Sequence, residues 1–577
     1  MRSMFAFTVL ALIGLVAFQY FKPAPPVPPA QEQRQEAASK QAQTLSPAQA
    51  AAATPATVST ATIGASAETL TIVENELYRI TFTNRGALVK SWILKRYKDS
   101  SGHPLDLVNQ RAAQDFGFPL SVFTYEPDLT QQLNSALYLP SSTGIVAAPA
   151  GVIFKYANGP LTVTKTFTFN ESYVIDTAVS VTHNGGPVRA LVQWPSGLGD
   201  QEEVGQFAKG LFAFSNDGKR DSIGPNKVSG NATINQPYDY AATLDLYFGA
   251  VFLPAVPSQA TVVTLHNAMS VPKDAASPNV DKFPGQVLGV AVGDVTGQTH
   301  ARLFAGPLQL DVLSNIHSTS PDGRTTGEDL KPLIQFGWLT VIAEPLFLLL
   351  RFVYEHAVHN WGWAIVLVTL LFNLVMLPTR FMMMKSSLKM QRIQPKIDAI
   401  KKKYAHLKAT DPKRADMNQE TMDLYKAENI NMYGSCLPML VQMPLFFAYY
   451  RVLANVIELR QATWGWLPNL AIADPMHILP IVIIASMFLV QFITPSPGMD
   501  PSQRRMMAFM MPVVFGFSMW NFASGLALYW TTSNLFNLSL QLLMNQSSLG
   551  RELHAIAAKR AAKTGNKTGP KTIQGRR

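Results

Sequence analysis

Polar side chains recur at helical spacing inside an apolar segment that is long enough to cross a bilayer. In residues 363–380, WAIVLVTLLFNLVMLPTR, three of them (Thr369, Asn373 and Arg380) share one face of a helix. Asn373 would lie roughly 18 Å from the outer end of this helix, near the middle of the membrane, with Arg380 close to the opposite boundary. An amide that faces hydrocarbon at this depth is costly, so this face is expected to meet water or neighbouring helices.

Other apolar segments carry polar or aromatic groups that would complete the same site. These residues are Gln442, Gln491, Tyr529, Trp530 and Thr532. Two interpretations are open for them. They line a wet groove that receives the polar part of a substrate, or they form hydrogen bonds between packed helices. The second interpretation suffices for any single residue, whereas the number of segments involved favours the groove for the set.

The residue types needed for covalent or metal chemistry are missing from these segments. No Asp or Glu lies deep inside one, which argues against a proton- or sodium-coupled carrier. No nucleophile elbow or HExxH motif occurs there. His356 and His359 lack a third partner for a metal. We therefore expect no cofactor, no metal and no enzymatic activity, but passage or docking of a substrate.

The elements that would position this site are six membrane-spanning helices. The chain has 577 residues, of which 47% are hydrophobic and 15% charged. Its strongly apolar segments reach or approach the ~20 residues that cross a bilayer. The predicted spans are 1–22, 361–384, 436–457, 476–494, 506–522 and 525–544. The first is interpreted as an uncleaved anchor rather than a signal peptide, because Lys-Pro-Ala-Pro-Pro follows it.

The charge distribution sets the expected topology. The net charge of +10 could suggest a nucleic-acid partner, but the basic residues gather in 385–432 and 551–577, beside the apolar segments. Basic residues in such positions stay in the cytosol, so both termini are expected there. The connections that should then be external contain Arg460 as their only basic residue.

The sequence after the first span predicts an external domain. Residues 23–67 are rich in Pro, Ala and Gln and predict a disordered linker. Residues 68–330 show strand alternation, as in LTVTKTFTFNESYVIDTAVSVTH, and predict a large antiparallel β-sandwich. A carbohydrate-active enzyme would need His103 or His183 beside acids in a cleft, and a solvated or core histidine is the simpler interpretation of each.

Three further segments complete the organisation. Residues 333–358 predict an amphipathic helix in the outer interface. Residues 385–432 predict a cytosolic helical hairpin, with one stripe that contains Ile393 and Ile397. Residues 551–577 form a basic cytosolic tail. The hairpin lysines, among them Lys401, Lys402 and Lys403, are expected to face solvent, anionic lipid, a nascent chain or ribosomal RNA. Cys436 is interpreted as a small buried hydrophobe.

Three segments closely resemble the YidC-type membrane protein insertases, within a match that runs in order over residues 335–548. They are LPTRFMMMKSSLKMQRIQPKIDAIKKKY, MNQETMDLYKAENINMYGSCLPMLVQMPLFFAYYRVL and FASGLALYWTTSNLFNLSLQLL. The anchor and external domain resemble the form found in bacteria with two membranes, whose periplasmic domain is similar to the sugar-mutarotase supersandwich. The resemblance implies a bacterial inner-membrane protein whose five-helix core forms a hydrophilic groove, open to the cytosol and to lipid but closed outside.

The resemblance also assigns residues. Thr369 matches the family's threonine, and Tyr529 and Trp530 match its paired aromatics. The family usually carries an arginine in the second span, and Asn373 stands at that position here. We therefore hypothesise that Arg380 supplies the positive potential from the cytosolic rim of the groove.

The resemblance implies insertion and folding of nascent inner-membrane proteins, alone or with the Sec translocon. Expected partners are nascent membrane proteins, the Sec translocon, anionic lipids and, through the basic tail, the ribosome, but not DNA. The alternative is a small-molecule transporter with a periplasmic sensor or carbohydrate-binding β domain. Buried carboxylates or paired half-repeats would favour that alternative, and the sequence has neither.

Overall fold

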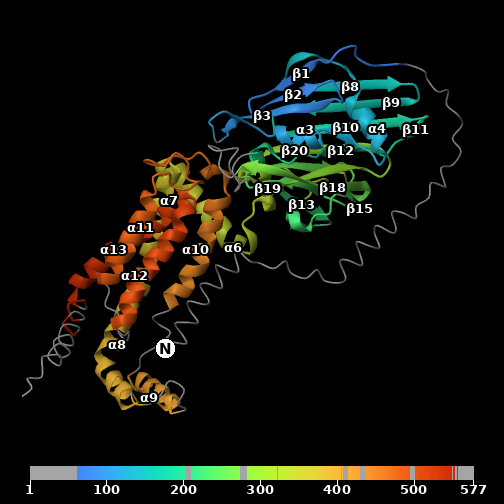
Figure 1. Ribbon diagram of the computed structural model, residues 1–577. Helices are drawn as coiled ribbons and strands as arrows, with labels where there is room; N and C mark the ends of the chain where they lie inside the picture. The colour runs from blue at the N-terminus through green and yellow to red at the C-terminus, as the bar shows by residue number, and fades with distance from the viewer. Residues whose placement is uncertain are drawn as a thin grey trace, which may run out of the picture.

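The computed structural model has two parts, a β domain and a helical part (Figure 1). It describes residues 62–99, 101–202, 210–216, 218–272, 282–320, 323–404, 406, 413–428, 437–493, 501–548, 550–552 and 555–556. The predicted anchor 1–22, nearly all of the predicted linker 23–67, Cys436 and most of the basic tail 551–577 lie outside these residues.

The first sheet of the β domain has five strands in the order β4–β3–β2–β1–β7. They are β1 (Leu70–Glu74), β2 (Tyr78–Thr83), β3 (Leu88–Lys98), β4 (Pro104–Asp106) and β7 (Gly144–Ala147). β2 and β3 form a hairpin whose turn contains Gly86 at φ 69°. β7 pairs with β1 in parallel, so the prediction of a wholly antiparallel domain is wrong here. Two short helices intervene between β1 and β7, and a connection of that length lets a strand return in the same direction.

Two more sheets complete the β domain. One has ten strands in the order β14–β13–β16–β17–β20–β10–β9–β8–β6, with β11 paired to β10, and the other has five in the order β15–β18–β19–β12–β5. The ten strands are β6 (Leu139–Pro140), β8 (Ala150–Asn158), β9 (Leu161–Phe169), β10 (Val174–His183), β11 (Gly186–Pro187), β13 (Leu211–Asn216), β14 (Lys219–Ile223), β16 (Tyr240–Leu244), β17 (Phe248–Pro254) and β20 (Gln298–Pro307). The five are β5 (Ser121–Phe123), β12 (Leu191–Trp194), β15 (Ala232–Asn235), β18 (Ala260–Pro272) and β19 (Lys282–Asp294).

Buried aromatic side chains join the sheets. The ring of Phe82 on β2 lies 5.2 Å from that of Phe167 on β9, and Trp92 on β3 lies 5.7 Å from Trp194 on β12. The first sheet therefore packs on both other sheets through large aromatic rings. Such rings bury more apolar surface per residue than other side chains do. Short helices cover the margins of this core. They are α3 (Gln110–Phe116), α4 (Pro127–Ser135) and α5 (Leu310–Ser314).

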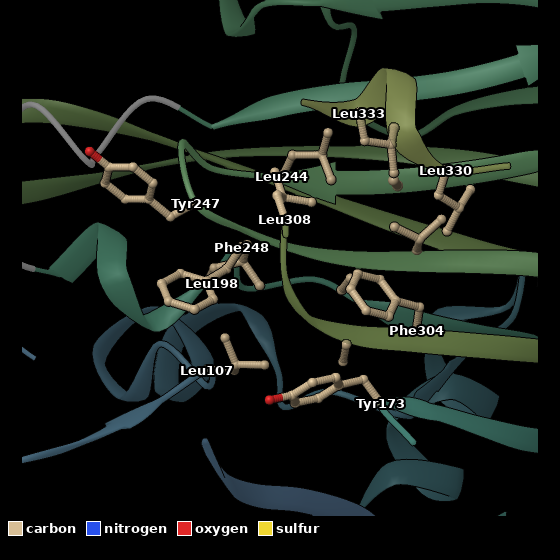
Figure 2. Packing of buried hydrophobic residues seen from close by; sticks show 14 of the residues in the cluster. Leu107, Tyr173, Leu198, Leu244, Tyr247, Phe248, Phe304, Leu308, Leu330 and Leu333 are labelled. Carbon is tan, nitrogen blue, oxygen red and sulfur yellow. The ribbon is translucent and has the colours of Figure 1, made fainter. Parts of the chain in front are cut away.

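The connection from the β domain to the helices is part of the same core. Figure 2 shows Leu330 and Leu333 of this connection among the buried side chains, which include Leu308 at the end of the ten-stranded sheet. The predicted amphipathic helix at 333–358 starts later than expected, as α6 (Thr340–Val353), because Gly337 turns the chain at φ 68°. A π-helical turn, Tyr354–Val358, continues it.

The helical part extends away from the β domain (Figure 1). Its other helices are α7 (Trp361–Val375), α8 (Leu377–Lys403), α9 (Arg414–Ala427), α10 (Leu437–Asn455), α11 (Ile478–Ile493), α12 (Pro501–Ser518) and α13 (Ser524–Gln546). Among the described residues, no single helix is both long and apolar enough to cross a bilayer, and Thr340–Val358 with Trp361–Val375 passes that test only as a pair bent by 113°. The predicted count of six spans thus stays a prediction.

The segment predicted as one span over 361–384 is two helices. α7 ends at Val375, and α8 continues from Leu377 past the predicted boundary between span and hairpin at 384/385. Pro378 lies in the first turn of α8, where a missing backbone N–H costs nothing, and its ring disfavours an uninterrupted helix before it. No helix breaker occurs near Lys385, and α8 runs on to Lys403 with Pro395 inside it.

Candidate functional site

α7 has a polar side that is buried among the other helices. Thr369 is 0% exposed, and its Oγ1 donates to the Ile365 carbonyl at 2.6 Å. Asn373 is 7% exposed, and its Nδ2 donates to the Thr369 carbonyl at 2.8 Å and lies 3.4 Å from Ser533 Oγ on α13. The amide predicted near mid-membrane therefore points into the bundle and links two helices.

The opposite side of α7 is apolar and exposed. Leu367, Leu371 and Leu374 form this stripe at intervals of four and three residues, so they share one face. They are among the exposed large hydrophobic residues of the chain. An exposed leucine face together with a buried amide face is the pattern of a helix that meets lipid on one side only.

A second polar contact joins α10 to α13. Gln442 Nε2 donates to the Tyr529 hydroxyl at 3.3 Å, and the Tyr529 ring stacks on Tyr449 at 4.2 Å between ring centroids. Trp530, the next residue on α13, lies between Phe446 of α10 at 4.8 Å and Phe515 of α12 at 4.4 Å. The two aromatic positions therefore contact different neighbours within the bundle.

Two buried polar atoms on α13 have no partner among the described residues. These atoms are Oγ1 of Thr531 and Nδ2 of Asn534, which follow the Tyr529–Trp530 pair. Thr532 is partly exposed, as is Gln491 of α11. A buried polar group without a protein partner is normally satisfied by water, so this part of α13 has the chemistry of a hydrated site.

Arg380 is set apart from the buried amide. It lies on α8, beyond the break at Met376, and is partly buried. The prediction that it shares one continuous helical face with Thr369 and Asn373 is therefore not met, because Pro378 interrupts the helix between them.

The predicted hairpin is present as two packed helices. Ile393 and Ile397 of α8 are buried against Leu424 and Tyr425 of α9. The three lysines Lys401, Lys402 and Lys403 end α8, at the part of the molecule farthest from the β domain (Figure 1). Lys402 and Lys403 are exposed and Lys401 partly so. Lys403 Nζ also lies 3.1 Å from a carboxylate oxygen of Glu420 on α9, so one of them closes the hairpin.

The histidines considered for a carbohydrate site do not form one. His103 is exposed, 3.5 Å from Asp99, and His183 is exposed at the end of β10. Among the described residues, no group of three or more His, Cys, Asp or Glu side chains could hold a metal ion.

A buried lysine and a buried ion pair outside the helices were not predicted. Lys165 on β9 is completely buried, and its Nζ donates to the carbonyls of Gly86, Ala87 and Leu120 at 2.6, 3.3 and 3.0 Å. Arg460 forms a buried ion pair with Asp200. Lys165 could have been noticed, since it alternates in phase with the apolar residues of its strand, but its partners are far away in the sequence.

Comparison with known proteins identifies the family. Residues 71–349 match the family model described as the YidC periplasmic domain, and residues 352–551 match that of the 60Kd inner membrane protein. The membrane protein insertase YidC of Geotalea uraniireducens (strain Rf4) is 32% identical over 502 residues, covering 82% of this chain and 87% of the relative. That of Ralstonia nicotianae is 31% identical over 513 residues, covering 85% of each.

A solved structure, described as an active YidC insertase with the first transmembrane domain resolved, aligns over 82% of this chain and 94% of its own. Its identity is 17% and its TM-score 0.33. The family models and the relatives match most of the chain. They cover both the β domain and the helical part. The chain therefore belongs to the YidC family of membrane protein insertases, non-enzymatic proteins of the inner membrane that carry a large periplasmic domain and act on nascent membrane proteins.

Proposed function

We propose that this insertase passes the polar flank of a nascent membrane protein through a hydrated groove formed by α7, α10 and α13. The groove opens to the cytosol and to lipid. The observation that carries this proposal is the pair of buried polar atoms on Thr531 and Asn534, which water would satisfy. The contact between Asn373 and Ser533 adds further buried polar atoms on another side of the same helix, α13.

Such a groove would lower the cost of insertion without an energy source. A charge at the bilayer centre costs about 2.5–3.5 kcal/mol on insertion scales. Water that enters from the cytosolic side shortens the hydrocarbon path that a charged flank must cross. The apolar part of the substrate then leaves the groove for lipid, in contact with aromatic residues such as Trp530.

The topology and the wider partners belong to the same proposal. Six spans, with both termini in the cytosol, place the α8–α9 hairpin where nascent chains emerge and the β domain in the periplasm. The exposed end of Lys402, next to the partly exposed Lys401, suits anionic headgroups or ribosomal RNA. We also propose that the protein works both alone and with the Sec translocon.

The groove can be tested by the accessibility of single cysteines. In a Cys436→Ala background, Thr531→Cys is expected to react with a water-dependent, membrane-permeant thiol reagent, because the Thr531 hydroxyl is itself a buried polar atom that water would satisfy. Leu371→Cys, on the exposed leucine side of α7, is the matched control and should stay unreactive in lipid. Equal, low reactivity at both positions would mean that the polar groups only fasten helices together.

The role of Arg380 is tested separately. Arg380→Ala should reduce insertion of a reporter with acidic flanks about fivefold, as expected for the loss of ~1 kcal/mol of attraction. Arg380→Lys keeps the charge and should retain most of the activity, and a reporter with neutral flanks should not respond. Unchanged insertion of the acidic reporter in Arg380→Ala would reject this role.

A further inference from the structure

A buried ion pair joins the β domain to the helical part. The pair connects Arg460, in the loop between α10 and α11, with Asp200 of the β domain. Its nitrogens Nη1 and Nη2 lie 2.6 and 2.7 Å from the two carboxylate oxygens, a bidentate arrangement. The two side chains are 4% and 0% exposed.

Aromatic rings and a second carboxylate surround this pair. The guanidinium carbon of Arg460 lies 5.5 Å from the ring centroid of Tyr247 and 5.2 Å from that of Phe248. In Figure 2, Phe248 belongs to the buried cluster of the β domain, while the Tyr247 hydroxyl points out of it. That hydroxyl lies 3.3 Å from the Ala454 carbonyl at the end of α10. Asp245, also buried, accepts the backbone N–H groups of both aromatic residues.

The loop that carries Arg460 covers the outer ends of two helices. On α7, the Asn360 amide donates to the Thr463 carbonyl at 3.0 Å, and Trp464 packs so closely on Gly362 that a Cβ there would lie 2.3 Å from the indole. On α13, the backbone N–H of Ser524 donates to the Ile472 carbonyl at 2.6 Å.

The side chain of Ser524 is also held by this loop, since its hydroxyl donates to the Asn469 carbonyl at 2.9 Å, and the residue is 0% exposed. The loop, residues 456–477, therefore has two sets of contacts. One lies on the helix ends, and the other is centred on Arg460 in the β domain, where Gln461 also donates to the Lys98 carbonyl at 2.6 Å.

We propose that the Asp200–Arg460 pair is a clamp through which the periplasmic domain holds the loop 456–477 closed over the outer ends of α7 and α13. A buried ion pair contributes little net stability compared with apolar residues, but the loss of one partner leaves an uncompensated buried charge. The pair therefore serves mainly to fix the position of the loop on the β domain, and it adds little to the free energy of folding. It makes closure of the outer end depend on a docked periplasmic domain.

The clamp is tested by labelling from the periplasmic side, which does not depend on the proposed groove. The full-length protein carries Ser524→Cys in a Cys436→Ala background, and cells with a permeabilised outer membrane receive a membrane-impermeant maleimide. With the clamp intact, the cysteine should be protected by the loop. Asp200→Asn or Arg460→Gln should each speed labelling by at least about tenfold, because either change removes one half of the bidentate ion pair.

Two further variants separate a clamp from general loss of structure. The double variant Asp200→Asn/Arg460→Gln should label more slowly than Arg460→Gln alone, because the single variant leaves Asp200 and Asp245 buried together without a cation. Glu328→Gln breaks an ion pair with Arg220, which is exposed and lies within the β domain, so it should leave labelling unchanged. Protection of Ser524→Cys in both single variants overturns the proposal. So does equally fast labelling in Glu328→Gln.

Discussion

The buried ammonium of Lys165 provides a quantitative test of how the β domain is held together. Lys165→Met keeps a long unbranched side chain in the core but removes the donor that serves three backbone carbonyls. Each buried carbonyl left without a partner costs about 1–2 kcal/mol, so the three together predict a loss of roughly 3–6 kcal/mol. Since a folded domain has only about 5–15 kcal/mol to lose, this single change should bring it close to unfolding.

The measurement is denaturant unfolding of the full-length protein in detergent below pH 7, where Lys165 keeps its proton, followed by hydrogen exchange of the backbone amides of β9 and β10. The matched control is Lys155→Met on the adjacent strand β8, where the lysine is exposed and the change should cost less than about 0.5 kcal/mol. If Lys165→Met and Lys155→Met shift the midpoint equally, the three carbonyls do not depend on the ammonium and the reasoning is refuted.

The remaining predictions concern the helix interface, the outer loop and pH. Asn373→Ala and Ser533→Ala should each destabilise the helical part, and a double-mutant cycle of thermal unfolding should give a coupling of about 0.5–1.5 kcal/mol; a value of zero would mean that their contact contributes nothing. Gly362→Ala should cost about 1–3 kcal/mol and increase proteolysis of the loop, because its Cβ would collide with Trp464, while unchanged proteolysis would contradict that packing. Burial lowers the pKa of Lys165 from 10.5 to about 7. The unfolded chain then binds one more proton between these values, so the stability of the β domain should rise with pH across that window, and this rise should be absent in Lys165→Met.

The local periodicity of the sequence predicted several features that the structure contains. The stripe with Ile393 and Ile397 indicated a packed hairpin, and these two residues are buried against α9. The spacing of Thr369 and Asn373 placed them on one side of a helix, and they are buried together on α7. Such patterns can be read from a short stretch of sequence, because a helix repeats every 3.6 residues. The elements that pack against the helix need not be known.

What the sequence could not supply were contacts between distant segments. Lys165 was part of a correctly predicted strand, but its three acceptors lie in turns 45 to 79 residues away. Arg460 was noticed as the only basic residue of the external connections, without a reason for its presence. Its partner Asp200 is 260 residues distant in the chain. The break at Met376 was within reach of the sequence, because Pro378 follows it closely and proline interrupts helices.

The 260-residue separation of Asp200 and Arg460 has a consequence for biosynthesis. A ribosome that adds roughly 5–20 residues per second needs on the order of 15–50 s to make the intervening chain. Throughout that interval, the carboxylates of Asp200 and Asp245 lack the guanidinium of Arg460, because Arg460 has not yet been synthesised. A newly made copy therefore exists first as a β domain with an unfinished acidic face. It reaches its final form only when the late-synthesised loop arrives, so the order of translation becomes the order of assembly.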